Sequence, residues 1–132
     1  MIKFQDIKVG DLVLAEFEGK QVEGVVKDLN REDKEICVET DVQQFWFTAN
    51  HLNPIPLSER QLSKLGFAKN VTSDGSAKYS KGSFRIQLPK DGDFSELEIW
   101  WREDRRHLNK PIHVHELQNH YYAMTKVELN VD

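Results

Sequence analysis

Apolar and polar residues alternate in short runs over the first part of the chain. These runs cover residues 12–17, 21–29, 34–40 and 43–47 and are separated by turn residues. Alternation with a period of two is typical of strands that bury one face. A hairpin signal at Glu18-Gly19 joins the first two runs. Four strands and a closing segment in about 50 residues predict a small SH3-like or Tudor-like barrel.

The same alternation predicts which side chains share a face of these strands. In the third run Ile36 and Val38 are expected to point inward and Cys37 outward. In the fourth run Phe45 and Phe47 lie opposite Trp46.

A short helix is predicted from Leu57 to Gly66. Ser58 and Gln61 have the spacing of a capping box, while Leu57 and Leu62 occupy the positions of a hydrophobic staple. Gly66 is a typical C-terminal stop. The helix therefore has both a start and an end signal.

Strand patterns return after this helix. They cover residues 67–69, 77–80, 83–88 and 96–101, which predicts an antiparallel meander. In the last of these runs Trp101 shares a face with the aliphatic residues, and Trp100 shares the other face with glutamates. Residues 102–110 are expected to form a polar, arginine-rich connection.

The final predicted helix covers residues 113–124. Val114, Leu117, Tyr121 and Met124 recur on one helical face. A possible edge strand follows at residues 127–131.

These elements predict an α+β chain that is mostly β. Its expected parts are an SH3-like barrel over 1–56 and a helix, meander and C-terminal helix over 57–132. The linker contains Pro54 and Pro56, which make it stiff. The two parts are therefore expected to pack and unfold as one unit.

The second half of the chain contains three distinctive motifs, PIPLS at 54–58, LGF at 65–67 and VHELQNHYYAMT at 114–125. With these motifs the chain resembles a family of short proteins from bacteroidete-type bacteria and their phages. The resemblance covers residues 52–129. Ser58 stands where the family usually has Thr, and Glu116 where it usually has Gln. The resemblance implies membership of that family but no activity, so it assigns no catalytic residue.

Charge and composition narrow the classes of function. The net charge is -4, with -5 in residues 1–54 and +1 in residues 55–132. An acidic first part repels phosphate backbones. The chain has one cysteine, no long apolar run and no signal-peptide pattern at its start. We therefore expect a cytoplasmic protein with no membrane partner.

The histidines of the last helix do not have a metal-site spacing. His115 and His120 are five residues apart, which places the rings on different helical faces. The sequence contains no hydrolase triad in a recognisable context and no glycine-rich phosphate loop. We expect no metal, no cofactor and no catalytic residue. A small enzyme that uses the His115 region is one hypothesis for function, and it ranks behind the two binding hypotheses described below.

Two groups of residues are candidates for binding. The basic residues Arg102, Arg105 and Arg106 follow Trp100, and tryptophan beside arginine can hold a nucleic acid. The alternative interpretation is a solvated loop. The polar stripe of the last helix comprises His115, Gln118, Asn119 and Tyr122, and it is either a recognition surface or a buried network.

The aromatic residues of the first part form a further candidate site. Phe17, Phe45, Trp46 and Phe47 are expected to line a peptide groove or cage, or else to be core. We therefore predict a noncatalytic binding module whose partner is a protein, encoded in a phage or mobile element. A nucleic-acid-binding accessory protein is the second alternative, and the acidic charge disfavours it.

Overall fold

The chain divides into two compact units. The computed structural model describes residues 2–131, and the units are Met1–Ile55 (unit 1) and Pro56–Asp132 (unit 2). The predicted boundary lies one residue away, between 56 and 57. Joint unfolding of the two units stays a prediction from the stiff linker. In the described part of the chain, no helix is long and apolar enough to span a membrane.

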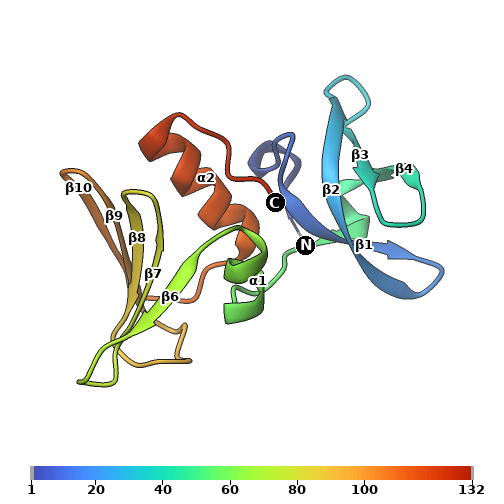
Figure 1. The fold of residues 1–132 in the computed structure, drawn as a ribbon. Coiled ribbons are helices and arrows are strands. Elements are labelled where there is room, and N and C mark those ends of the chain that lie inside the picture. The colour runs from blue at the N-terminus through green and yellow to red at the C-terminus, as the bar shows by residue number, and fades with distance from the viewer. Residues whose placement is uncertain (1, 132) are drawn as a thin grey trace. The chain divides into compact units, whose positions relative to one another are not determined.

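Unit 1 is a five-stranded antiparallel sheet in the order β4-β3-β2-β1-β5 (Figure 1). Its strands are β1 (Leu12–Phe17), β2 (Lys20–Asn30), β3 (Glu35–Glu39), β4 (Gln44–Thr48) and β5 (Leu52–Asn53). Short 3-10 turns cover Phe4–Asp6 (η1) and Ala49–His51 (η2). The four predicted strands are confirmed. The edge strands β4 and β5 do not pair with each other, so the sheet is open rather than a closed barrel.

The core of unit 1 lies on one face of this sheet. Val13, Val26, Ile36 and Val38 are all fully buried there. Cys37 points to the opposite face, but it is also buried, at 2% exposure. Its Sγ accepts a hydrogen bond of 3.2 Å from Gln44 Nε2. Cys37 therefore points away from Ile36 and Val38 as predicted, and neighbouring side chains bury it on that face too.

Unit 2 contains a second antiparallel sheet, in the order β10-β9-β8-β7-β6. Its strands are β6 (Ala68–Val71), β7 (Ala77–Lys81), β8 (Phe84–Leu88), β9 (Leu97–Trp101) and β10 (Asp104–Leu108), and its helices are α1 (Glu59–Lys64) and α2 (Val114–Thr125). The helix α2 lies against one face of the sheet (Figure 1). Phe84 of β8 meets Tyr121 of α2 with ring centroids 4.6 Å apart.

The prediction of a polar connection over residues 102–110 is wrong. Residues 104–108 form β10, which pairs along its whole length with β9. Arg102 makes the tight turn between them in a left-handed conformation, with φ of 58°. Polar residues are common on edge strands, where they limit further pairing. Charged side chains on both faces of β10 therefore concealed its strand period.

The N-terminus of α1 has the Ser58 half of the predicted capping box, whereas Gln61 Oε1 does not accept the reciprocal bond from the Ser58 N–H. Ser58 is the N-cap, and its Oγ accepts a hydrogen bond of 3.3 Å from the Gln61 backbone N–H. Leu57 and Leu62 are both buried. Gly66 has φ of 90°, which suits the residue that ends a helix. Local signals were sufficient here because they act within one turn.

Replacement of the cap should destabilise unit 2 measurably. Ser58→Ala removes the acceptor for the Gln61 N–H, and we expect the free energy of unfolding to fall by about 1 kcal/mol. Ser63→Ala is the matched control, because Ser63 lies exposed in the same helix. Urea unfolding of both variants measures the difference. Equal effects of the two substitutions would contradict the capping role.

The N-terminus of α2 has a cap that the sequence analysis did not identify. The His113 backbone N–H donates to Glu116 Oε1 at 2.9 Å. At the other end, residues 127–131 form no strand. Leu129 is instead fully buried, and its carbonyl accepts a hydrogen bond of 2.8 Å from Gln118 Nε2. The predicted edge strand is therefore wrong, because one buried side chain rather than a strand ladder holds this segment.

Candidate functional site

Three phenylalanines of unit 1 meet across the concave face of its sheet. Phe17 ends β1, while Phe45 and Phe47 alternate along β4. The Phe17 and Phe45 rings stack with centroids 5.1 Å apart, and Phe45 meets Phe47 edge-on at 6.4 Å. Strands β2 and β3 lie between β1 and β4 in the sheet order. The Phe17–Phe45 contact therefore requires the sheet to curl strongly.

This curl encloses an apolar pocket of about 220 Å³. Its lining residues, here called the aromatic pocket, are Ala15, Phe17, Val22, Val38, Thr40, Val42, Gln43, Phe45 and Phe47. Several of them remain accessible to solvent: Phe17 is 36% exposed, Phe45 38% and Val42 80%. Contiguous exposed apolar surface with this lining is typical of an interaction site.

Two acidic residues, here called the acidic rim, lie in the turns beside the aromatic pocket, and Lys20 lies opposite Phe17 in the β1–β2 hairpin. Glu18 lies in the β1–β2 turn beside Phe17, and Asp41 lies in the β3–β4 turn beside Val42. Both are exposed, and neither forms an ion pair within the part of the chain that the structure describes. The rim therefore favours a cationic group next to the apolar pocket.

Trp46 does not belong to the aromatic pocket. It alternates with Phe45 and Phe47 along β4, so its side chain lies on the other face of the sheet, where it is 48% exposed. Its cross-strand neighbour is Cys37. The sequence correctly separated Trp46 from the two phenylalanines by face. Of the four residues that it offered either as a groove or as core, Trp46 lies outside the aromatic pocket.

A second candidate surface lies on the face of the unit 2 sheet opposite α2. Leu97 and Ile99 of β9 are buried on the inner face, so Trp100 points outward. Its cross-strand neighbours are Arg85 of β8 and Arg105 of β10. The Lys78 Nζ, Arg85 Cζ and Arg105 Cζ atoms lie 5.7, 5.5 and 5.1 Å from the centroid of the Trp100 ring. We call these four residues the Trp100 surface.

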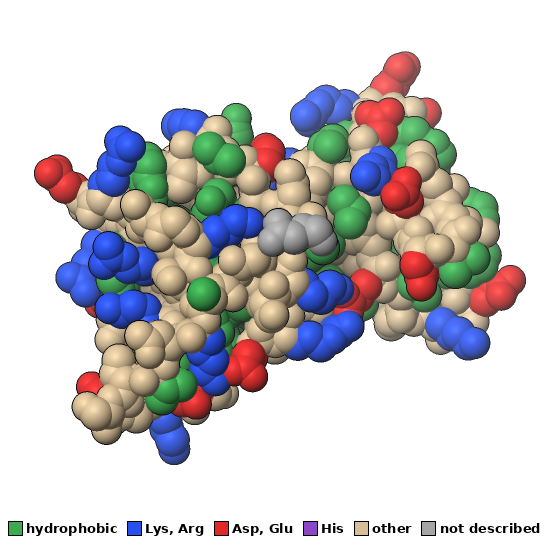
Figure 2. Space-filling view, viewed as in Figure 1, with side chains coloured by type: hydrophobic (Ala, Val, Ile, Leu, Met, Phe, Trp, Pro, Cys, Tyr) green, Lys and Arg blue, Asp and Glu red, His purple; other side chains and the backbone are tan. Residues whose placement is uncertain are grey.

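Two of the three cations on this surface lack an acidic partner. Arg105 forms a salt bridge of 3.0 Å with Glu98. Lys78 and Arg85 form no ion pair with any residue from 2 to 131. Figure 2 shows Lys and Arg side chains gathered over the part of unit 2 that carries β8 to β10. The surface therefore offers a partly exposed indole beneath uncompensated positive charge.

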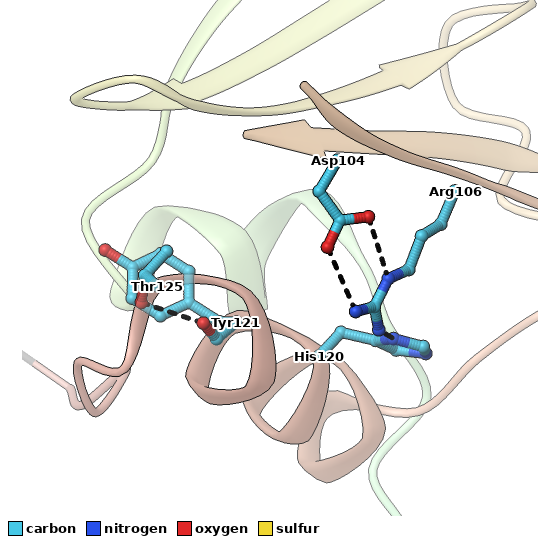
Figure 3. Close-up of polar contacts among 5 residues, drawn as sticks. All are labelled: Asp104, Arg106, His120, Tyr121 and Thr125. Atoms are coloured by element: carbon cyan, nitrogen blue, oxygen red, sulfur yellow. Dashed lines mark hydrogen bonds and ion pairs between the residues drawn. The ribbon is translucent and has the colours of Figure 1, made fainter. Parts of the chain in front are cut away.

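Arg102 and Arg106, the other predicted basic site residues, lie elsewhere in unit 2. Arg102 stacks on Trp101, with its Cζ 4.3 Å from the ring centroid. Arg106 forms a two-pronged contact with Asp104, at 3.2 and 3.3 Å, and reaches His120 Nδ1 at 3.0 Å (Figure 3). The predicted basic cluster is therefore divided between two faces of the sheet and a turn.

His120 is neutral in this arrangement. Burial lowers the pKa of its imidazole, and the positive charge of Arg106 lowers it further. Because an arginine only donates hydrogen bonds, the Nδ1 of His120 is the acceptor. The group joins β10 to α2 and has a structural role. In the same helix Thr125 Oγ1 donates to the Tyr121 carbonyl at 2.8 Å (Figure 3).

The polar stripe predicted for α2 is largely internal. His115 is 6% exposed and Gln118 is fully buried, while Asn119 is partly buried and Tyr122 is 37% exposed. Of the two interpretations, a buried network fits Gln118, which holds the Leu129 carbonyl. The four residues do not form one recognition surface.

Sequence reasoning did not identify Lys78 and Arg85 as members of a site. The signal for them was present, because both lie on predicted strands at positions that alternate with buried residues. What was lacking was the register, which sets Arg85 opposite Trp100.

Within residues 2–131, no three His, Cys, Asp or Glu side chains are grouped to hold a metal ion.

The fold and the two surfaces define an α+β, mostly β chain of two antiparallel sheet units. No protein-family model, curated protein or solved structure matches this chain. The family resemblance of residues 52–129 therefore stays a prediction from its motifs.

Proposed function

We propose that this protein is a noncatalytic protein-binding module. Unit 1 binds a segment of a partner protein that places one apolar side chain in the aromatic pocket and a Lys or Arg against the acidic rim. The single observation that carries the proposal is the exposed, phenylalanine-lined pocket in the curl of the sheet. An SH3-like architecture for this open sheet is part of the same proposal.

The size of the pocket favours a side chain over a cofactor. Pockets for drug-sized ligands usually have volumes of about 300 Å³ or more. The aromatic pocket, at about 220 Å³, is smaller than that. Binding energy at protein interfaces concentrates in a few anchor residues that fill such pockets. A single aliphatic or aromatic anchor therefore suits the space.

The charge of unit 1 specifies the residues beside the anchor. Residues 1–54 carry six Lys or Arg and eleven Asp or Glu, which gives -5. Glu18 and Asp41 place part of this charge at the pocket rim without an ion-pair partner in the described chain. A partner segment with Lys or Arg next to its apolar anchor matches this surface.

Two synthetic peptides test the proposal directly. One carries a single Leu flanked by Lys in a Gly/Ser background, and its twin has Glu in place of Lys. Titration followed by amide NMR should shift resonances of residues 15–22 and 38–47. We expect the Lys peptide to bind about fivefold more tightly or better, as expected for about 1 kcal/mol of charge attraction.

Substitutions on the two faces of β4 provide matched variants. Phe45→Ser should weaken binding of the Lys peptide about tenfold or more, because it removes a wall of the pocket. Trp46→Ser alters an exposed aromatic residue of the same strand on the other face, and binding should persist. Val42→Lys, at an 80% exposed position, should reduce the preference for Lys over Glu. Equal affinity of the Phe45→Ser and Trp46→Ser variants, or shifts outside the pocket, would overturn the proposal.

A further inference from the structure

We propose that the Trp100 surface of unit 2 is a binding site for single-stranded nucleic acid. A base stacks on the ring-and-guanidinium platform of Trp100 and Arg105, and the backbone phosphates contact Lys78 and Arg85. This site lies on a different unit from the aromatic pocket and does not depend on the proposed protein-binding function.

The side chains around Trp100 are positioned by the pairing register of their strands and do not come from flexible loops. Arg85, Trp100 and Arg105 are direct cross-strand neighbours on three adjacent strands, β8, β9 and β10. Lys78 of β7 lies in the neighbouring cross-strand row, opposite Gln87, and its Nζ reaches over the indole at 5.7 Å. Aromatic side chains on an open sheet face stack unpaired bases, and arginine planes do the same. Rigid strands hold these groups in place before binding.

Charge on the surface is available for phosphates. Lys78 and Arg85 have no ion-pair partner among the described residues, whereas Arg105 is held by Glu98. Residues 55–132 carry twelve Lys or Arg and eleven Asp or Glu, so this half lacks the acidic excess of the first. Phosphate contact therefore meets no strong local repulsion.

A hollow beside the platform supplies hydrogen-bonding groups for a neighbouring nucleotide. It has a volume of about 310 Å³ and is lined by Gln87, Pro89, Leu97, Glu98, Arg105 and His107. The amide of Gln87 can pair with base edges, and the Glu98 carboxylate can accept from an exocyclic amino group. These side chains extend the Trp100 surface along the strands.

The same chemistry distinguishes a nucleic acid from an acidic peptide. Both ligands bring negative charge to Lys78 and Arg85, but only the nucleic acid also has flat rings for the Trp100 indole. The observations therefore favour single-stranded nucleic acid.

Fluorescence anisotropy with labelled oligo(dT) and oligo(U) tests the inference in the full-length chain. We expect binding that weakens between about 50 and 200 mM salt, as phosphate contacts require. The double variant Lys78→Gln with Arg85→Gln should lower the slope of log K against log salt by about 1.4, or about 0.7 for each lost contact. Trp100→Ala should weaken binding about tenfold or more, and Trp100→Phe should restore most of it.

Matched controls separate a specific site from general charge. Lys90→Gln with Lys110→Gln also removes two positive charges, but from exposed connections beyond β8 and β10, and should leave the affinity within about twofold. Binding that is unchanged in the Lys78/Arg85 variant would overturn the inference. Equal competition by polyglutamate would assign the surface to acidic peptides instead, and equal competition by duplex DNA would exclude recognition of unpaired bases. Thermal unfolding of each variant checks that the fold is retained.

Discussion

Phe84→Ala is expected to lower the free energy of unfolding by about 3–5 kcal/mol, as for other large-to-small changes of a buried phenylalanine. Phe84 is 1% exposed and contacts both Tyr121 of α2, at 4.6 Å, and Phe67, at 6.1 Å between ring centroids. Its removal leaves a cavity where the sheet of unit 2 meets the helix.

Urea unfolding followed by far-UV circular dichroism measures this effect. Val71→Ala is the control, because Val71 lies in the same sheet but is 50% exposed. It should change the free energy of unfolding by about 0.5 kcal/mol or less. A Phe84→Ala effect as small as that of the control would show that α2 is not packed on the sheet through this ring.

Gly24→Val is expected to destabilise unit 1 by about 1–3 kcal/mol or more through overpacking. A Cβ atom at Gly24 would lie 2.5 Å from Val38 Cγ1 and 2.9 Å from the Glu39 carbonyl oxygen. Real Cβ atoms essentially never approach other atoms so closely. Strands β2 and β3 would have to separate at this point, and a backbone oxygen cannot rotate away.

A double-variant cycle shows whether the close approach is the cause. Val38→Ala removes the Cγ1 atom nearest to the added Cβ, so Gly24→Ala with Val38→Ala should be less destabilised than the sum of the two single variants. Lys20→Val, at an exposed position of the same strand, is the control for β propensity. Strict additivity of the two core changes would contradict the steric explanation.

The Phe84 and Gly24 variants also bear on the coupling of the two units. They lie in units 2 and 1 respectively. If the units unfold together, as the stiff linker predicts, both substitutions displace one common transition. If each displaces a transition of its own, the units are independent and the linker only connects them.

Local patterns predicted most of the strands and the α1 cap correctly. The alternation of Phe84, Ile86 and Leu88, now all buried, is an example. The failures share a cause. Strand β10 has charged residues on both faces. The segment around Leu129 is held by the buried Leu129 side chain and by side-chain hydrogen bonds from Gln118 and Thr125 rather than by a strand ladder. Neither feature produces an alternation of apolar and polar residues that could be recognised in the sequence.

The candidate sites were predicted less completely than the fold. The sequence identified Phe17, Phe45 and Phe47, and it identified Trp100 with Arg105. It also placed Trp46 in the aromatic groove and His115 and Gln118 in a possible surface stripe. Trp46 lies on the other face of its strand, and the two helix residues are buried. A polar residue at an apparently outward helical position can still be covered by the segment that follows the helix, as at Gln118, which donates to the Leu129 carbonyl.

By itself the sequence determined where strands and helices begin, because turns, caps and hydrophobic periods act over a few neighbouring residues. Only the tertiary structure decided which side chains meet. The Phe17–Phe45 contact depends on the curl of four strands, and the positions of Lys78, Arg85 and Arg105 around Trp100 depend on the register of four others. Curl and register arise from the packing of the whole sheet, so no local pattern contains them.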